Sequence, residues 1–270
     1  MLQLAQIRQI ERNLLHRFSD ICKENEITFW LSNGTLLGAV KYNGFIPWDD
    51  DVDILVPRKD YDRLIRIFKD TDDMTLLSPE RNQEYLYPFA KLCDNRTILE
   101  EKNYSNGVEL GVNIDVFPLD NLGQDYEKGC RLVRKNKTIT KWLGFSKINQ
   151  YIPNEKRNKV QILLRRMVLI CCKTVGAKRF RNLIMKNARK YEFDSNPKYV
   201  GCALWPVYIE GEVLPAEVFR KTTFVSFEGD QYPAPEGYDI YLRGLYGNYE
   251  EDPPLEKQIT HHNFTAYWMK

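Results

Sequence analysis

The stretch GFIPWDDDVDILVPRKDY, residues 44–61, decides the fold. It places four aspartates, Asp49, Asp50, Asp51 and Asp53, within five positions and continues into an apolar run that ends at Pro57. Carboxylates that crowd together beside a buried strand repel one another and lose solvation, so they need a neutralising partner. The stretch therefore predicts a cation site at one end of a buried strand.

Strand alternation divides the four acids. In a strand, Asp51 and Asp53 share one face while Val52 points to the other, and the two aspartate Cα atoms are roughly 6.6 Å apart. Two convergent carboxylates at this spacing suit Mg²⁺ or Mn²⁺, as in phosphoryl-transfer sites. We interpret Asp49 and Asp50 as supporting or capping groups on the approach to the strand.

A calcium loop of the EF-hand type does not fit the same residues. If Asp49, Asp51 and Asp53 take the first ligand positions, Ile54 falls where glycine is required, and Pro57 lies inside the loop. A purely structural cation site is the alternative that stays open.

A third aspartate occurs downstream in GVNIDVFPLD, residues 111–120, where Asp115 stands alone in an otherwise apolar strand pattern. An isolated carboxylate there needs a cation or a strong donor, whereas we expect Asp120 at the surface or in a cap. Upstream, LSNGTLLG (31–38) indicates a strand, a turn and a helix, and the turn amides at Gly34 with the Thr35 hydroxyl suit a phosphate.

The rest of the chain predicts a mixed α/β fold. We expect a core in residues 1–124, a basic helical segment in 125–195, and a C-terminal segment, 196–270, that packs back on the core and completes the site. Expected helices are 2–25, a short one closed by Gly44, 59–70 and 236–247; expected strands are 27–32, 51–57, several in 74–120, and a hairpin in 223–235.

Composition points to a cytoplasmic protein. The 270 residues are 43% apolar and 28% charged, with no signal peptide and no run long enough to span a membrane. Six cysteines show no Cys-x-x-Cys pair, so we expect free thiols, buried at Cys171 and Cys172, and no structural zinc.

The basic charge is concentrated in one segment. Residues 131–190 contain eighteen Lys or Arg and a single acid, Glu155. We interpret the apolar and basic stretch 155–181 first as a core helix with a solvated face. The alternative is an interfacial helix on anionic lipid at the inner face of the membrane. No nucleic-acid-binding motif accompanies it, so a nucleic-acid partner is not expected.

These motifs resemble the LicD family of phosphotransferases, which belongs to the nucleotidyltransferase-fold superfamily and includes fukutin-type relatives. The matching segments are SNGTLLGAVKYNGFIPWDDDVDILVPRKDY, YPFAKLCD, NIDVFPLD and LYGNYEEDPPLEKQITHH. The resemblance implies a nucleotidyltransferase-like mixed sheet flanked by helices, with a basic helical insertion. It also implies a catalytic, metal-binding centre at Gly34 with Thr35, Asp51 with Asp53, and Asp115.

The resemblance further implies transfer of phosphocholine, or a similar phospho-alcohol, from a CDP-activated donor such as CDP-choline. The acceptor would be a hydroxyl of a cell-surface glycan precursor on a lipid carrier, such as teichoic acid, lipopolysaccharide or a capsule repeat. Two alternatives stay open: a nucleotidyltransferase that leaves the nucleotide on its acceptor, and a non-catalytic cation- or glycan-binding protein.

Three further residues are candidates for donor binding, each with a structural alternative. Lys91 either pairs with a donor phosphate or is a surface lysine whose stem covers apolar residues. Trp48 either stacks on cytosine or packs against the strand. His262 either contacts donor or acceptor or is an ordinary surface histidine.

Overall fold

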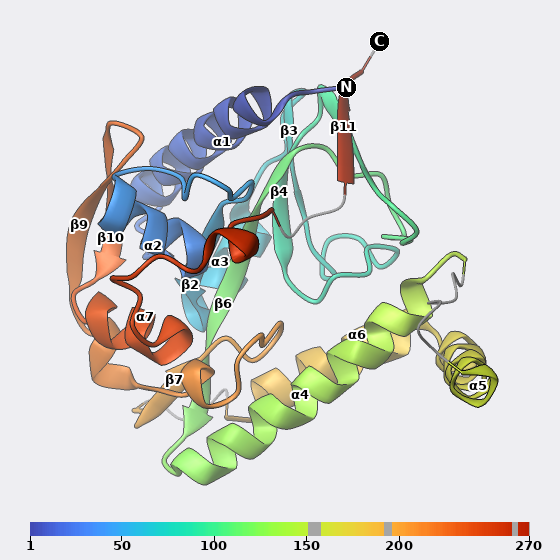
Figure 1. Ribbon diagram of the computed structural model, residues 1–270. Helices are drawn as coiled ribbons and strands as arrows, with labels where there is room; N and C mark the ends of the chain where they lie inside the picture. The colour runs from blue at the N-terminus through green and yellow to red at the C-terminus, as the bar shows by residue number, and fades with distance from the viewer. Residues whose placement is uncertain (151–157, 192–195, 261–263, 270) are drawn as a thin grey trace.

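A mixed β-sheet forms the centre of the protein, as seen in a computed structural model that describes residues 1–150, 158–191, 196–260 and 264–269 (Figure 1). The strands of the sheet are β1 (Trp30–Leu31), β2 (Asp53–Pro57), β3 (Met74–Leu77), β4 (Ala90–Asp94), β6 (Asn113–Gly123), β7 (Tyr199–Gly201) and β8 (Leu214–Pro215). Their order is β1-β2-β6-β4-β3, and β7 with β8 extends the sheet from β6. Only β2 and β6 run parallel among these pairs. The mixed α/β class predicted from the sequence is confirmed.

Helices surround this sheet (Figure 1). They are α1 (Leu4–Glu24), α2 (Asn33–Tyr42), α3 (Arg58–Ile67), α4 (Tyr126–Lys147), α5 (Lys159–Val175), α6 (Ala177–Ala188) and α7 (Tyr238–Tyr246), with short 3₁₀ turns η1 (Arg189–Tyr191), η2 (Glu210–Glu212), η3 (Ala216–Phe219) and η4 (Leu255–Lys257). The apolar stripe of α1 explains its place, since Ile7, Leu14 and Phe18 recur at helical spacing and are all buried. No helix within the described ranges is both long and apolar enough to cross a membrane.

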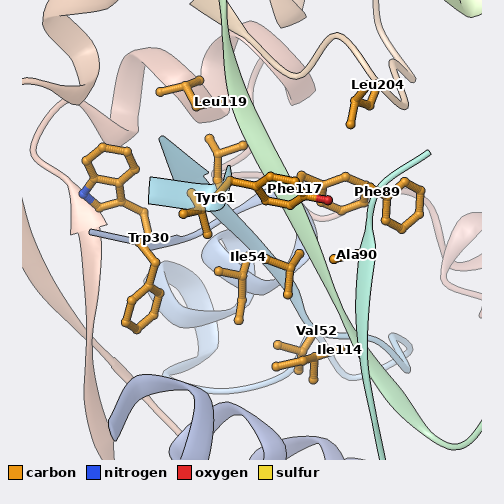
Figure 2. Packing of buried hydrophobic residues seen from close by; sticks show 14 of the residues in the cluster. Trp30, Val52, Ile54, Tyr61, Phe89, Ala90, Ile114, Phe117, Leu119 and Leu204 are labelled. Carbon is orange, nitrogen blue, oxygen red and sulfur yellow. The ribbon is translucent and has the colours of Figure 1, made fainter. Parts of the chain in front are cut away.

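The core lies between the sheet and its helices, and Figure 2 shows part of it. Along β6, Ile114 and Val116 are fully buried, and they alternate with Asp115 and Phe117, which line the cleft described below. The Phe117 ring packs on Phe89 with centroids 4.3 Å apart. Because side chains alternate along a strand, one strand supplies both the apolar core and the cleft.

The C-terminal region returns to the N-terminal core. β11 (Phe264–Trp268) pairs with β5 (Thr97–Glu101), and the Leu2 amide donates to the Ala266 carbonyl at 2.7 Å, so the two ends of the chain meet (Figure 1). β9 (Thr222–Phe227) and β10 (Asp230–Pro235) form the predicted hairpin, and α7 ends at Gly247 as expected. Residues of all three predicted segments join one hydrophobic core; their division at 124/125 and 195/196 stays a prediction.

Two local predictions around α2 were wrong. Residues 33–35, expected as a turn, form the first turn of α2, because Leu36 N already donates to Ser32 O at 3.0 Å. The helix is closed by Asn43 rather than Gly44, and Asn43 adopts the left-handed conformation with φ 54°. Asparagine tolerates this conformation because its short polar side chain bonds locally.

Asp120 is also placed differently from the prediction. It was expected at the surface or in a cap, yet its side chain is 1% exposed and ion-paired with Arg58, at 2.6 Å from Asp120 Oδ1 to Arg58 Nη2. Burial raises the pKa of Asp120, and the nearby Arg58 guanidinium opposes that rise. The pair joins β6 to the start of α3, which follows β2 directly in the chain.

The basic segment differs from its first interpretation. Only Leu169 and Cys172 of α5 are buried, and the remaining apolar residues of that helix are at least partly exposed. The core-helix interpretation of 155–181 is therefore wrong for α5. Cys171, expected to be buried, is exposed.

Candidate active site

Three charged side chains form one row across the middle of the sheet. Asp53 of β2 stands directly opposite Asp115 of β6, and Lys91 of β4 stands opposite Asp115 on its other side. The Lys91 ammonium donates to Asp115 Oδ1 and, at 3.0 Å, to Asn113 Oδ1. Residues sixty-two positions apart are thus neighbours, because β2 and β6 pair in parallel register.

The first turn of α2 holds the start of β2. The Asp53 amide donates to Thr35 Oγ1 at 2.8 Å, and the Ser32 amide donates to the Asp53 carbonyl at 3.1 Å. Thr35 is buried, so its hydroxyl acts inside the fold as an acceptor for the backbone. Asn33 has a left-handed φ of 46° and also donates to the Asp53 carboxylate. Such strained residues persist where the surroundings fix them, which is common at functional sites.

A cleft of about 890 Å³ opens over this row. Five of the residues predicted from the sequence line it: Gly34, Trp48, Asp51, Asp53 and Asp115. A smaller hollow of about 620 Å³ beside α1 contains none of the predicted residues that the structure describes.

Asp51 lines the cleft from a loop, whereas the sequence predicted that it belongs to a strand. β2 begins at Asp53, so Asp51 lies in the loop before the strand, and strand alternation does not govern its direction. The half-buried Asp51 nevertheless lines the same cleft as Asp53.

Asp49, which the sequence interpretation gave only a supporting or capping role, also lines the cleft. A Cβ atom on Gly34 would lie only 2.6 Å from Asp49 Oδ2, so a residue without a side chain allows the approach. Arg8 of α1 fixes the loop itself, donating to the carbonyls of Ile46 at 2.9 Å and of Asp49 at 3.0 Å. Strand alternation does not extend to Asp49, because β2 begins at Asp53, so its place beside Gly34 depends on how the loop folds. Asp50 is buried, and its Oδ2 accepts from Thr260 Oγ1 at 2.9 Å.

The carboxylates strongly disfavour one another's ionised form. Burial, reinforced by Asp115, raises the pKa of Asp53 from 3.8 to about 7. Burial, with Asp53 and Asp49 next in effect, raises the pKa of Asp51 well above its ordinary value. Behind them lies Glu11 of α1, whose pKa is raised by burial and by Asp50, and whose buried Oε2 receives no hydrogen bond from the described residues. Its spacing from Ile7 and Leu14 places it on the buried face of α1, which was visible in the sequence. A bound cation would relieve this repulsion.

The metal assignment has a limit that the geometry imposes. Within the described residues, no three His, Cys, Asp or Glu side chains are arranged as a ready metal site. The donor set is still chemically suitable, because Mg²⁺ prefers oxygen ligands and commonly uses one or two carboxylates together with substrate phosphates.

Lys91 and Thr35 are predicted site residues that do not line the cleft. The Lys91 ammonium is buried on Asp115, so the alternative of a surface lysine is wrong. Burial alone would lower the pKa of Lys91, and the Asp115 carboxylate outweighs it and raises that pKa. Trp48 packs edge-on against Tyr42, with centroids 6.3 Å apart, while also lining the cleft. His262 lies outside the described residues. The donor-binding roles of all these residues stay predictions.

Comparison with known proteins places this site in a family. Residues 26–155, which carry the aspartates and the Gly34–Thr35 turn, match the profile of "LicD/FKTN/FKRP, nucleotidyltransferase domain". These residues belong to the LicD/FKTN/FKRP nucleotidyltransferase-domain family.

The chain is also similar to individual proteins. The chain is similar to the lipopolysaccharide cholinephosphotransferase LicD of Haemophilus influenzae, at 28% identity over 94% of each protein. It is also similar to an uncharacterized protein of Rickettsia prowazekii, at 38% identity over 40% of this chain and 50% of that protein. The mannosyltransferase regulator 4 of Saccharomyces cerevisiae is 32% identical over 40% of this chain and 9% of that protein.

Residues outside the LicD-family match also line the cleft. Trp205, Tyr208, Tyr246 and Glu212 line it, and the rings of Tyr208 and Tyr246 meet edge to face at 5.9 Å. Glu212 is buried, and its Oε1 accepts from the amides of Val207 at 3.0 Å and Tyr208 at 3.3 Å. Nothing in the local sequence distinguishes Glu212 from the other acids, so only the fold could reveal it.

Proposed function

We propose that this protein transfers phosphocholine, or a similar phospho-alcohol, from a CDP-activated donor to a hydroxyl of a cell-surface glycan, releasing CMP. The observation that carries the proposal is the cleft in which Asp51, Asp53 and Asp115 converge within a LicD-family domain. The similarity to a lipopolysaccharide cholinephosphotransferase over 94% of both chains supports both the donor and the acceptor class.

In the proposed reaction the acceptor oxygen forms a bond to the phosphorus that bears the alcohol. The bond from that phosphorus to the oxygen bridging to CMP breaks, and CMP leaves with the electron pair. Asp115, held by Lys91, would orient or deprotonate the acceptor hydroxyl. Asp51, Asp53 and Asp115 would hold Mg²⁺ or Mn²⁺, which when bound neutralises charge on the donor pyrophosphate.

Four lining residues outside the LicD-family match support a cationic alcohol such as choline as part of the donor. Aromatic faces attract quaternary ammonium groups, and a cation beside a buried carboxyl group favours its ionised form, which then adds an opposite charge. Trp205, Tyr208 and Tyr246 supply the rings and Glu212 supplies the carboxylate. CDP-choline should therefore raise the melting temperature more than CDP-glycerol, whose alcohol is uncharged, when each is added with Mg²⁺.

The deciding experiment compares the native chain with Asp51→Asn. We expect Mg²⁺ with CDP-choline to raise the melting temperature of the native chain and to leave that of the variant unchanged, because the isosteric amide carries no charge for the metal. Turnover of CDP-choline should fall at least about a thousandfold in the variant. Persistent turnover, or an equal melting shift in both proteins, would show that the metal assignment is wrong.

The mass of the product separates the proposal from its alternatives. An acceptor that gains phosphocholine supports the proposed transfer, whereas one that gains CMP identifies a nucleotidyltransferase. A chain that binds donor or glycan with no turnover under any divalent cation would be a binding protein.

A further inference from the structure

The helix α5 presents its apolar side to the outside of the protein. Val160, Leu164, Met167, Cys171 and Val175 recur every three or four residues, which places them along one face of the helix. All five are exposed, as are the flanking apolar residues Leu163, Val168 and Ile170. We call these eight residues the outer stripe.

The two buried residues of α5 lie on the opposite side. Leu169 is nine positions from Val160, half a turn around the helix, and is 5% exposed, whereas Val160 is 65% exposed. Cys172, on the same inner side, is 6% exposed. An amphipathic helix normally turns its apolar face toward the core, so the orientation of α5 is the reverse of the usual one. Figure 1 shows α5 at the outer edge of the molecule, beside α4 and α6.

The segment that carries the outer stripe has charged residues of one sign. Residues 158–191 contain ten Lys or Arg and no Asp or Glu. Lys159 and Lys173 of α5 and Arg179 and Lys186 of α6 are exposed. An exposed apolar stripe of this size marks an interaction surface, and its basic surroundings favour an anionic partner.

We propose that α5 is a membrane-surface helix, which inserts the outer stripe into the interface of an anionic bilayer while the surrounding basic side chains contact lipid phosphates. The helix has seventeen residues, about 25 Å, and lies flat rather than crossing, because no helix in the described part of the chain can span a bilayer. A second copy of this chain is the less suitable occupant, because two basic surfaces would repel each other on contact.

The test is flotation of the full chain with vesicles of phosphatidylcholine alone and of phosphatidylcholine mixed with phosphatidylglycerol. We expect binding to the mixed vesicles, weaker binding at high salt, and little binding to phosphatidylcholine alone. Leu163→Glu should weaken binding to the mixed vesicles by about tenfold or more, because it places a charge where a leucine side chain would be inserted into the bilayer. Leu163 is 60% exposed, so its replacement leaves the fold intact, which a thermal melt of the free variant checks.

Phe224→Glu provides the matched control. Phe224 of β9 is 65% exposed and lies outside the outer stripe, so its variant should bind vesicles like the native chain. Equal losses in both variants, or no binding to mixed vesicles at all, would overturn the proposal. So would light scattering that finds a native dimer which Leu163→Glu dissociates, because the outer stripe would then be a contact between two copies. Every readout uses the protein without donor or metal, so the result is separate from the proposed transferase activity.

Discussion

Glu212 is a buried carboxylate whose ionisation depends on the fold. Burial raises its pKa from 4.5 to about 7, against the two amides of Val207 and Tyr208 that donate to it and lower the pKa. Between pH 4.5 and pH 7 the Glu212 carboxyl group is therefore protonated in the folded protein and ionised in the unfolded chain. The contribution of Glu212 to the free energy of unfolding is full below pH 4.5 and is lost as the pH rises toward 7.

The Glu212→Gln variant should reveal this loss directly. Glutamine keeps an oxygen for the two amides and does not titrate. As the pH rises from 5 to 8, the free energy of unfolding of the variant should therefore increase by about 2 to 3 kcal/mol relative to that of the native chain. Urea unfolding of both proteins across that range measures the difference. A difference that stays constant with pH would mean that Glu212 has an ordinary pKa in the fold.

Lys91 and Asp115 form an ion pair in which the two side chains are 10% and 18% exposed. Lys91→Met removes one charge and leaves the other partly buried, so we expect a loss of about 3 kcal/mol in the free energy of unfolding. Adding Asp115→Leu removes the remaining charge and should recover most of that loss, although not the activity. If the double variant is as unstable as the single one, the lysine acts by packing its stem and ammonium on the rings of Tyr87 and Phe89, 4.9 and 5.4 Å away.

At the scale of elements, α2 contributes to both the cleft and the core. Gly34 lines the cleft, and Gly38 packs against the backbone of the following loop. A Cβ atom at Gly34 would lie 2.6 Å from the end of the Asp49 side chain, which can move. A Cβ atom at Gly38, one turn later, would lie 2.4 Å from the backbone carbonyl of Gly44, which cannot move without shifting the loop.

The same substitution should therefore have opposite effects at the two positions. Gly34→Ala should leave the melting temperature unchanged or slightly higher, since alanine is the better helix former, while kcat/KM falls about tenfold because Asp49 is displaced from the cleft. Gly38→Ala should lower the free energy of unfolding by about 2 kcal/mol. Thermal melts and donor turnover of both variants check this. A Gly34→Ala variant with native kinetics would show that the position of Asp49 is unimportant.

At the scale of the whole molecule, the basic helices contribute unequally to the fold. α4 and α6 supply core residues such as Leu143 and Ile184, both fully buried, whereas α5 supplies only Leu169 and Cys172. The C-terminal end of α5 also lies close to the residues that follow α4, since Lys173 Nζ donates to the Asn149 carbonyl at 3.4 Å.

Replacing residues 151–175 with a short Gly/Ser linker should consequently leave a folded protein. We expect one cooperative unfolding transition and unchanged donor turnover, with vesicle binding lost, because the removed helix carries the outer stripe and few core contacts. Calorimetry, a CDP-choline assay and flotation measure the three properties. Loss of cooperative unfolding would show that α5 is needed for the core.

The sequence alone determined the elements whose cause is local. Helical spacing in α1 and α3, the β9–β10 hairpin and the apolar runs of β2 and β6 depend on neighbours along the chain, and they were predictable for that reason. The sequence also indicated that Asp51, Asp53 and Asp115 are functional candidates, because a carboxylate in or beside an apolar run is costly to bury without a partner.

Tertiary structure decided which of these residues meet. The parallel pairing of β2 with β6 makes Asp53 and Asp115 neighbours, and the pairing of β4 with β6 turns Lys91 onto Asp115. The burial of Glu212 and the outward stripe of α5 arise in the same way. Periodicity shows that a helix has an apolar face, and only the packing of the whole chain settles whether that face turns toward the core or toward the outside.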